Sequence, residues 1–369
     1  MQRVPVISKD GTPLMPAKPS RVRRWLRDGN ARVFPNDLGV FAVQLLFDTG
    51  SETQDIAIGI DPGKKFTGVA VQSAKVTLWM GHLNLPFSNV RKRMEQRAMM
   101  RRGRRGRRID RKLPFSQRAH RQKRFDNRKQ SKIPPSIRAN RELELRVFDE
   151  LIELFPVEAV CYEIIKASGS RGFSPVMVGQ HWMLERFKSD YTSLTVLTQQ
   201  GWETSNLRQY LNLPKEKKDK SKEIRATHAT DAIALAASHF TQYKQIKGLR
   251  GWWEGSVQVS LAAPFAAISR PPVSRRQLHL MVPSKGGLRR KYGGTVTRHG
   301  FRKGDFVEAT KAGLTDRGWV SGDTKTQVSV SDANWKRIGQ FTARKVRLLK
   351  RNTGLICKNT YGGDVSSRR

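Results

Sequence analysis

The chain has few cysteines and no long apolar run. Its two cysteines among 369 residues, Cys161 and Cys357, are too few and too far apart for a disulfide framework or a paired-cysteine zinc site. No stretch of 18 apolar residues is present, so we expect no membrane-spanning helix and no membrane partner. Residues Met1–Pro5 lack the apolar stretch of a signal peptide, and we therefore expect a cytoplasmic protein.

Acidic residues are also scarce. The chain holds 31 Asp and Glu against 70 Lys and Arg, which gives a formal net charge of +39. Such a charge repels itself unless a polyanion neutralises it, and neutralising phosphates also releases their counterions. Because 37% of the residues are hydrophobic, the chain can form packed cores, and its length predicts two or three domains. We therefore expect a folded protein that binds nucleic acid.

The first 55 residues have the pattern of a small basic module. Prolines at both ends of Pro13–Pro16 predict a rigid turn or extended segment. A short helix is predicted over Pro19–Asp28, ended by Gly29, and a strand over Val40–Phe47. Four arginines of the helix are candidate RNA contacts: Arg21, Arg23, Arg24 and Arg27.

A β-hairpin is predicted next. The apolar run Ile56–Ile60 predicts a buried strand, Asp61–Lys65 a turn and Thr67–Gln72 a returning strand. Val76–Met80 is a candidate third strand.

An arginine-rich segment follows. Residues 91–112 hold 12 Lys and Arg among 22, and the residues around Met94–Met100 favour a helix that Gly103 and Gly106 weaken further on. The basic stretch 113–137 is poor in core residues and predicts an extended connection. Nine arginines are candidate RNA contacts, since arginine pairs bidentately with phosphate and stacks on bases: Arg91, Arg93, Arg97, Arg101, Arg102, Arg104, Arg105, Arg107 and Arg108.

Alternating strands and helices are predicted beyond this connection. Apolar spacing predicts an amphipathic helix over Arg138–Phe155 and a strand over Val157–Ile165. A helix near 180–190, a strand near 194–198, a lysine-rich loop over Lys215–Lys222 and a helix over Glu223–Tyr243 follow.

The last part of the chain, 251–369, contains short apolar stretches separated by glycines. This pattern predicts a small β-barrel-like domain. Its basic cluster supplies the candidate DNA contacts, most of which we expect to touch phosphate: Arg289, Arg290, Lys291, Arg298, Arg302 and Lys303.

Three carboxylates and a histidine stand where a sheet-based fold brings them together. Asp61 ends one buried strand, Glu163 lies near the end of another, and Asp231 shares a helix face with His228. Each also has an ordinary structural explanation when taken alone: Asp61 as a turn residue, Glu163 as a surface residue, and His228 with Asp231 as a hydrogen-bonded pair on a helix. Together they are the oxygen-rich set that two-metal phosphodiester hydrolysis requires.

These segments resemble known nuclease motifs. Ile58–Gly63 with Thr67–Ala70 resembles the first RuvC segment, Val160–Glu163 the second and Thr227–Ala232 the third. The arginine-rich stretch resembles the bridge helix of CRISPR effector nucleases, and the Pro-Leu-Met-Pro turn resembles the N-terminal signature of IscB and its relatives. Residues 291–295 are similar to the start of their C-terminal DNA-contacting domain. The order of the parts is preserved over most of the chain.

One departure points to a particular branch. IscB carries an HNH nuclease between its second and third RuvC segments, whereas here 64 residues (164–227) lie between Glu163 and His228 and contain the single histidine His181. An HNH site needs paired histidines, which this interval lacks. The chain therefore resembles IsrB, the HNH-lacking relative.

The resemblance implies an α/β protein with an RNase H-like (RuvC) core split by insertions. Its implied parts are an N-terminal basic module (1–55), RuvC segment I (56–90), the bridge helix and connection (91–137), RuvC segment II (138–200), RuvC segment III (201–250) and the β-rich C-terminal domain (251–369).

The resemblance also implies an activity. A monomeric ribonucleoprotein would use a structured guide RNA and a short adjacent motif to find double-stranded target DNA, and would nick the non-target strand. Asp61, Glu163 and Asp231 would hold two Mg²⁺ ions, with Mn²⁺ a possible substitute, while His228 orients or deprotonates the attacking water.

Two other functions fit part of the pattern. A non-catalytic RNA-binding protein accounts for the charge but not for the carboxylates. An RNase H-like resolvase or transposase accounts for the carboxylates but not for the long arginine-rich segment.

Overall fold

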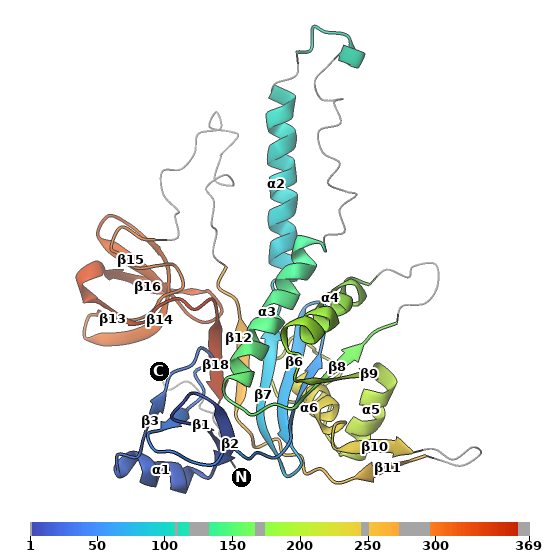
Figure 1. Ribbon diagram of the computed structural model, residues 1–369. Helices are drawn as coiled ribbons and strands as arrows, with labels where there is room; N and C mark the ends of the chain where they lie inside the picture. Colours follow the sequence, from blue (N-terminus) through green and yellow to red (C-terminus); the bar gives the residue numbers. More distant parts are fainter. Residues whose placement is uncertain are drawn as a thin grey trace. The chain divides into compact units, whose positions relative to one another are not determined.

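The computed structural model describes residues 2–107, 110–117, 133–166, 174–244, 251–272 and 296–360 (Figure 1). Over these ranges the protein is mixed α/β, with six α-helices and several sheets. It divides into two compact units. The first comprises Met1–Pro86, Ile137–Arg270 and Leu355–Arg369, and the second Phe87–Ser136 and Pro271–Gly354. None of the helices in the described ranges has the length and hydropathy of a bilayer span.

The first unit begins with a small four-stranded sheet. Its strands lie in the order β2-β1-β4-β3, and their bounds are β1 Val4–Ile7, β2 Pro13–Ala17, β3 Ala31–Phe34 and β4 Ala42–Leu45. The helix predicted over 19–28 is confirmed as α1, Pro19–Arg27. Pro19 stands in its first turn, where the missing N–H removes no hydrogen bond. Val22 and Trp25 of α1 pack with the sheet.

A seven-stranded sheet forms the centre of the first unit. Its order is β18-β12-β7-β6-β5-β8-β9. The predicted hairpin is confirmed as β5 Ile56–Asp61 and β6 Phe66–Ser73, and β7 Val76–Asn84 continues the antiparallel meander. On the other side of β5, β8 Ala159–Ile164 and β9 Thr195–Gln200 add in parallel. The edge beyond β7 is completed by β12 Phe265–Ser269 and β18 Ile356–Thr360.

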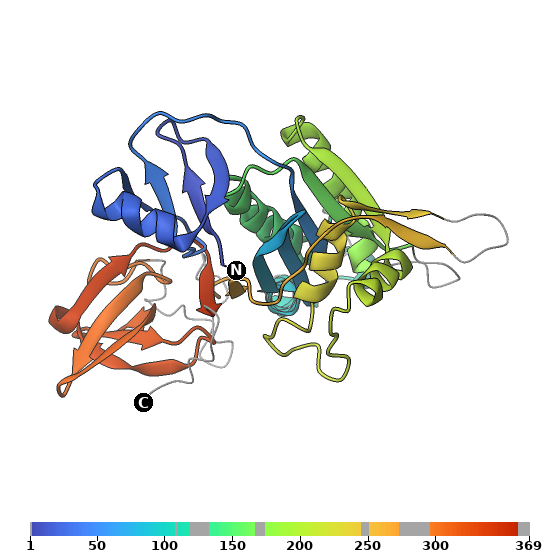
Figure 2. The same ribbon diagram turned by 90° about the horizontal axis from the view of Figure 1, so that it is seen from below.

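Helices cover both faces of this sheet. Because strand side chains alternate between faces, Ile58 and Ile60 of β5 pack with α3, Pro135–Ile152, and with α4, Pro175–Asp190. The opposite face, with Ala57 of β5, packs against α6, Ala229–Ala237. Figures 1 and 2 show the sheet between these helices. The predicted helix over 138–155 is thus confirmed in substance, with both bounds earlier by three residues.

Local predictions between β9 and β12 were partly wrong. The expected helix over 223–243 is α6 alone, because residues 241–244 form strand β10, Thr241–Lys244, which pairs with β11, Trp252–Gly255. Helix α5, Gly201–Tyr210, was not predicted at all. Its start carries a usable signal: the Glu203 carboxylate accepts a hydrogen bond from the Gln200 N–H at 2.6 Å, as in a capping box.

The second unit contains the arginine-rich helix and a five-stranded sheet. Helix α2 spans Phe87–Arg107, so it continues through Gly103 and Gly106, which were expected to weaken it. The antiparallel sheet has the order β16-β15-β14-β13-β17. Its strands are β13 Phe306–Lys311, β14 Leu314–Asp323, β15 Gln327–Ser331, β16 Arg337–Thr342 and β17 Val346–Lys350.

The expected barrel-like domain therefore needs correction. In the described part of the second unit the five-stranded sheet is open, because no strand pairing closes it. Two strands of the 251–369 segment, β12 and β18, pair with each other inside the first unit, where β12 also pairs with β7. Of the predicted connection over 113–137, residues 118–132 lie outside the described ranges.

Candidate functional site

Two of the predicted carboxylates stand at the ends of neighbouring parallel strands. In the β5–β8 pair, Ile60 lies opposite Tyr162, so Asp61 and Glu163 are the next residues on the two strands. Ile60 and Tyr162 belong to the core on the α3 face. By the two-residue period of a strand, Asp61 and Glu163 therefore face the α6 side.

Helix α6 approaches that face unusually closely because two strand residues are glycines. A Cβ on Gly59 would lie 2.0 Å from the Ala232 carbonyl oxygen, and one on Gly68 would lie 2.1 Å from the His228 carbonyl oxygen. Only residues without a side chain allow the helix backbone to rest on the sheet in this way. The close contact brings the start of α6, with His228 as its N-cap residue and Asp231 in its first turn, to the ends of β5 and β8.

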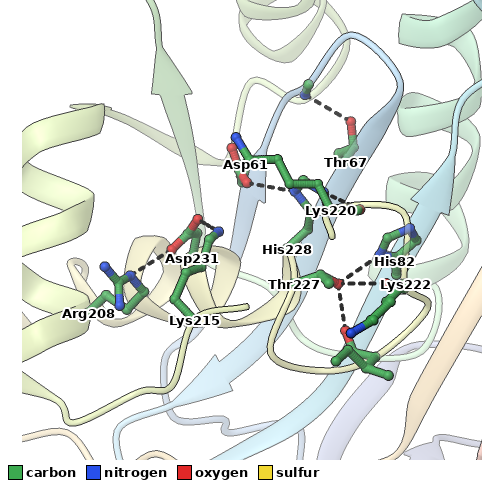
Figure 3. A network of polar contacts seen from close by, with 12 residues as sticks. Asp61, Thr67, His82, Arg208, Lys215, Lys220, Lys222, Thr227, His228 and Asp231 are labelled. Atoms are coloured by element: carbon green, nitrogen blue, oxygen red, sulfur yellow. Dashed lines mark hydrogen bonds and ion pairs between the residues drawn. The ribbon is translucent and has the colours of Figure 1, made fainter. Parts of the chain in front are cut away.

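Histidine 228 bridges the helix start and the strand end (Figure 3). Its Nδ1 lies 3.6 Å from Oδ2 of Asp61, and its Nε2 lies 3.2 Å from the Lys220 carbonyl oxygen. The ring centroid of His82 on β7 lies 5.2 Å from that of His228, edge to face, and His82 Nδ1 contacts the Thr227 hydroxyl at 3.1 Å. The imidazole of His228 is thus held from two sides, with one nitrogen toward Asp61.

Asp231 is paired with two cations. Its Oδ1 lies 3.0 Å from Arg208 Nε on α5, and its Oδ2 is bonded to the Lys215 ammonium (Figure 3). All three side chains are at most 17% exposed. Sequence reasoning missed both partners. Arg208 lies on the unpredicted helix, and Lys215 was seen only as part of a lysine-rich loop.

In this cluster, carboxyl groups of like charge lie near one another and are partly shielded from water. Burial raises the pKa of Glu163 to about 8, with the neighbouring Asp61 and then Asp231 carboxylates as further causes. Burial also raises the pKa of Asp231, and Asp61 adds to the shift against Lys215 and Arg208. A cation that enters the cluster stabilises the ionised form of these carboxyls and favours release of their protons.

The donor atoms suit a hard divalent cation, since carboxylate oxygens are the ligands that Mg²⁺ prefers. In the described ranges, however, no three His, Cys, Asp or Glu side chains stand close enough together to hold a metal ion. The ion pair of Asp231 with Lys215 gives a physical reason. Both oxygens of Asp231 are paired, one with Arg208 and one with Lys215, so a cation shared by Asp231, Asp61 and Glu163 competes with these two side chains.

The predicted RNA contacts lie on two exposed helices. On α1, Arg21, Arg23, Arg24 and Arg27 are exposed, and the Arg21 guanidinium lies over the Trp25 ring at 5.5 Å. On α2, Arg91, Arg97, Arg101 and Arg102 are exposed, while Arg93 is half-buried and donates to the Pro272 carbonyl at 3.1 Å. Arg104, Arg105 and Arg107 belong to α2, although their side chains lie outside the described set, and Arg108 lies outside the described ranges.

The predicted DNA contacts are only partly described. Arg289, Arg290 and Lys291 lie outside the described ranges. Arg298 and Arg302 are exposed and Lys303 is half-buried, at the start of the five-stranded sheet. Arg298 lies 3.8 Å from Asp323.

Residues 4–170 match the model of a family described as RRXRR protein. That family is associated with IscB- and IsrB-like proteins. The match includes Asp61, α2 and Glu163 and ends before α6. The pattern in the family's description occurs twice on this chain, at 101–105 and 104–108. No curated protein matches the chain.

Proposed function

We propose that this chain is an RNA-guided DNA endonuclease of the IsrB type, which nicks the non-target strand at a RuvC-like site. The observation that carries the proposal is the convergence of Asp61, Glu163, His228 and Asp231. Three distant segments bring these residues to one face of one sheet. The strand order supports an RNase H-like core, because a three-stranded antiparallel meander (β7-β6-β5) continues into two parallel strands (β8-β9). The RRXRR match supports the same assignment for the first half of the chain.

The residues of the site have separate roles in this proposal. Asp61, Glu163 and Asp231 would hold two Mg²⁺ ions, which supply charge stabilisation at the scissile phosphate and lower the pKa of a bound water. His228 would orient or deprotonate the attacking water, since one of its nitrogens faces Asp61 and the other is held by the Lys220 carbonyl. Lys215 would leave Asp231 as the site assembles, and its ammonium would then be free to pair with a phosphate oxygen.

The arginine-rich surfaces would bind the guide RNA. The exposed arginines of α1 and α2 present guanidinium groups at helical spacing, which suits backbone phosphates rather than base edges. Base pairing by the guide would then read most of the target, and the basic residues 289–303 would contact a short motif in duplex DNA.

The test begins with sequencing of RNA that co-purifies with the full chain. A supercoiled plasmid, with a target matched to the variable end of that RNA beside randomised flanks, is then assayed for nicking with Mg²⁺. We expect one specific RNA and a guide-dependent nick that Asp61→Ala abolishes while RNA binding remains. Heterogeneous RNA and no guided nick would refute the proposal and leave a basic RNA-binding protein. Cleavage of branched DNA by a dimer would instead indicate a resolvase.

A further inference from the structure

A buried ion pair lies on the face of the central sheet opposite the carboxylates. Arg141 and Glu144 of α3 are 1% and 0% exposed, and Arg141 Nη1 lies 3.0 Å from Glu144 Oε2. Neither residue is among the predicted site residues. Charged side chains are almost never fully buried without a specific partner, so this pair needs a reason.

The pair is bonded to the turn that follows Asp61. Arg141 Nη2 donates to the Gly63 carbonyl at 2.9 Å. The Thr67 hydroxyl donates to Glu144 Oε1 at 2.5 Å and accepts from the Gly63 N–H at 3.2 Å. Both polar backbone groups of Gly63, two residues after Asp61, are therefore fixed through Arg141 and Glu144.

The same arginine also reaches the strand that carries Glu163. Arg141 Nη1 donates to the Tyr162 hydroxyl at 2.6 Å. Tyr162 directly precedes Glu163, and its side chain points to the α3 face while Glu163 points to the other. One guanidinium thus joins the turn after Asp61 to the residue before Glu163.

A buried ion pair is in general a weak source of stability. Replacing a buried ion pair with well-packed apolar residues is often neutral or stabilising, because both charges lose their hydration on folding. Burial here raises the pKa of Glu144 to about 6 in spite of Arg141. The rigid fork of arginine, which can bond two acceptors at fixed positions, is the property that apolar residues cannot replace.

We propose that Arg141, with Glu144 orienting it, is a positioning residue that sets the distance between the Asp61 and Glu163 carboxylates for divalent-cation binding. This inference rests on the proposed function, since it assigns a cation to those two carboxylates. It adds a part to that site that no motif resemblance contains. Arg141 and Glu144 would act from the α3 face of the sheet and would contact neither the cation nor the nucleic acid.

The test is Arg141→Lys, which keeps a positive charge beside Glu144 but cannot bridge Gly63 and Tyr162 at once. The matched control is Arg146→Lys on the same helix, where Arg146 pairs with Glu150 at 2.7 Å and with Asp37 at 2.6 Å, away from the carboxylates. Binding of Mn²⁺ to the full chain is measured by calorimetry and by its electron paramagnetic resonance signal, together with the unfolding temperature.

We expect Arg141→Lys to weaken Mn²⁺ binding by roughly 10–100-fold, the range found for groups that orient metal ligands. Arg146→Lys should bind as the wild type does. Wild-type affinity in Arg141→Lys would overturn the inference. If Asp61→Asn also binds Mn²⁺ as the wild type does, the carboxylate site of the proposed function fails as well, so the two failures are distinguishable.

A second variant guards against simple loss of folding. Arg141→Met combined with Glu144→Leu removes both buried charges together, so that no unpaired charge remains in the core. Because the Gly63 carbonyl and the Tyr162 and Thr67 hydroxyls lose their partners, we expect a folded chain with a lowered unfolding temperature. The inference expects the same loss of Mn²⁺ affinity in this variant. Unchanged affinity would overturn it.

Discussion

Binding of a divalent cation should release a proton from Glu163. Burial, with the Asp61 and Asp231 carboxylates as further causes, raises the pKa of Glu163 to about 8. At about pH 7, one unit below that value, roughly nine-tenths of the Glu163 side chains carry a proton. Because the cation binds the ionised carboxylate, about 0.9 proton should leave Glu163 per cation bound. Below about pH 8, apparent affinity should rise about tenfold per pH unit and then level off.

The assay is calorimetry of Mn²⁺ binding in two buffers with different protonation enthalpies, since the difference in measured heat counts released protons. Glu163→Gln is the control, because it keeps the shape of the side chain but has no proton to release. We expect weaker binding in this variant with about 0.9 fewer protons released at about pH 7. Equal proton release by the two proteins would refute the reasoning, since Glu163 would then already be ionised.

The same shift also affects the stability of the cation-free protein. A carboxyl whose folded-state pKa lies above its unfolded value binds its proton more tightly when folded. It therefore costs stability once the unfolded form ionises. The free energy of unfolding should accordingly fall as pH rises from about 4.5 to about 8 and change little above that, as far as Glu163 is concerned. Glu163→Gln should remove this part of the pH dependence.

Three further predictions concern the helix contact, the lysine and the arginines. Gly59→Ala should lower the free energy of unfolding by about 1–3 kcal/mol or more in chemical denaturation, because its Cβ would meet the α6 backbone at 2.0 Å. Gly322→Ala, which has open space around it, is the control and should change the free energy of unfolding little. Equal effects of the two substitutions would contradict the argument. Lys215→Met should tighten Mn²⁺ binding by about tenfold or more, since it removes a cation that competes for Asp231. Lys222→Met, in the same loop, is the control and should leave the Mn²⁺ affinity unchanged. Weaker Mn²⁺ binding by Lys215→Met would contradict this reasoning. Replacing the four arginines of 101–105 with alanine should lower RNA affinity and reduce its salt slope by roughly 0.7–0.9 per lost phosphate contact, and an unchanged slope would remove α2 from the RNA surface.

Local patterns in the sequence were sufficient for the main elements around the site. The apolar run before Asp61 and the turn at Pro62 and Gly63 predict the β5–β6 hairpin, because each signal acts between residues close in the chain. The amphipathic spacing of Leu143, Val147 and Leu151 likewise predicts α3. The large basic excess, a property of composition alone, predicts the polyanion partner.

Other features depended on contacts between distant segments. Strand β18 pairs with β12, which lies far from it in the sequence, and the residues of neither strand predict this pairing. The pairing of Asp231 with Arg208 and Lys215 depends on α5 and its following loop folding against the start of α6.

The two faces of the central sheet differ in how much of their structure the sequence alone predicts. Alternation along β5 and β8 determines, from sequence, that Asp61 and Glu163 share a face once the strands are known. The spacing of Arg141 and Glu144 on α3 is that of an ordinary surface ion pair, three residues apart. Only the packing of α3 and α4 against the sheet buries that pair and directs it to the turn after Asp61, because burial depends on what covers a side chain rather than on the side chain itself.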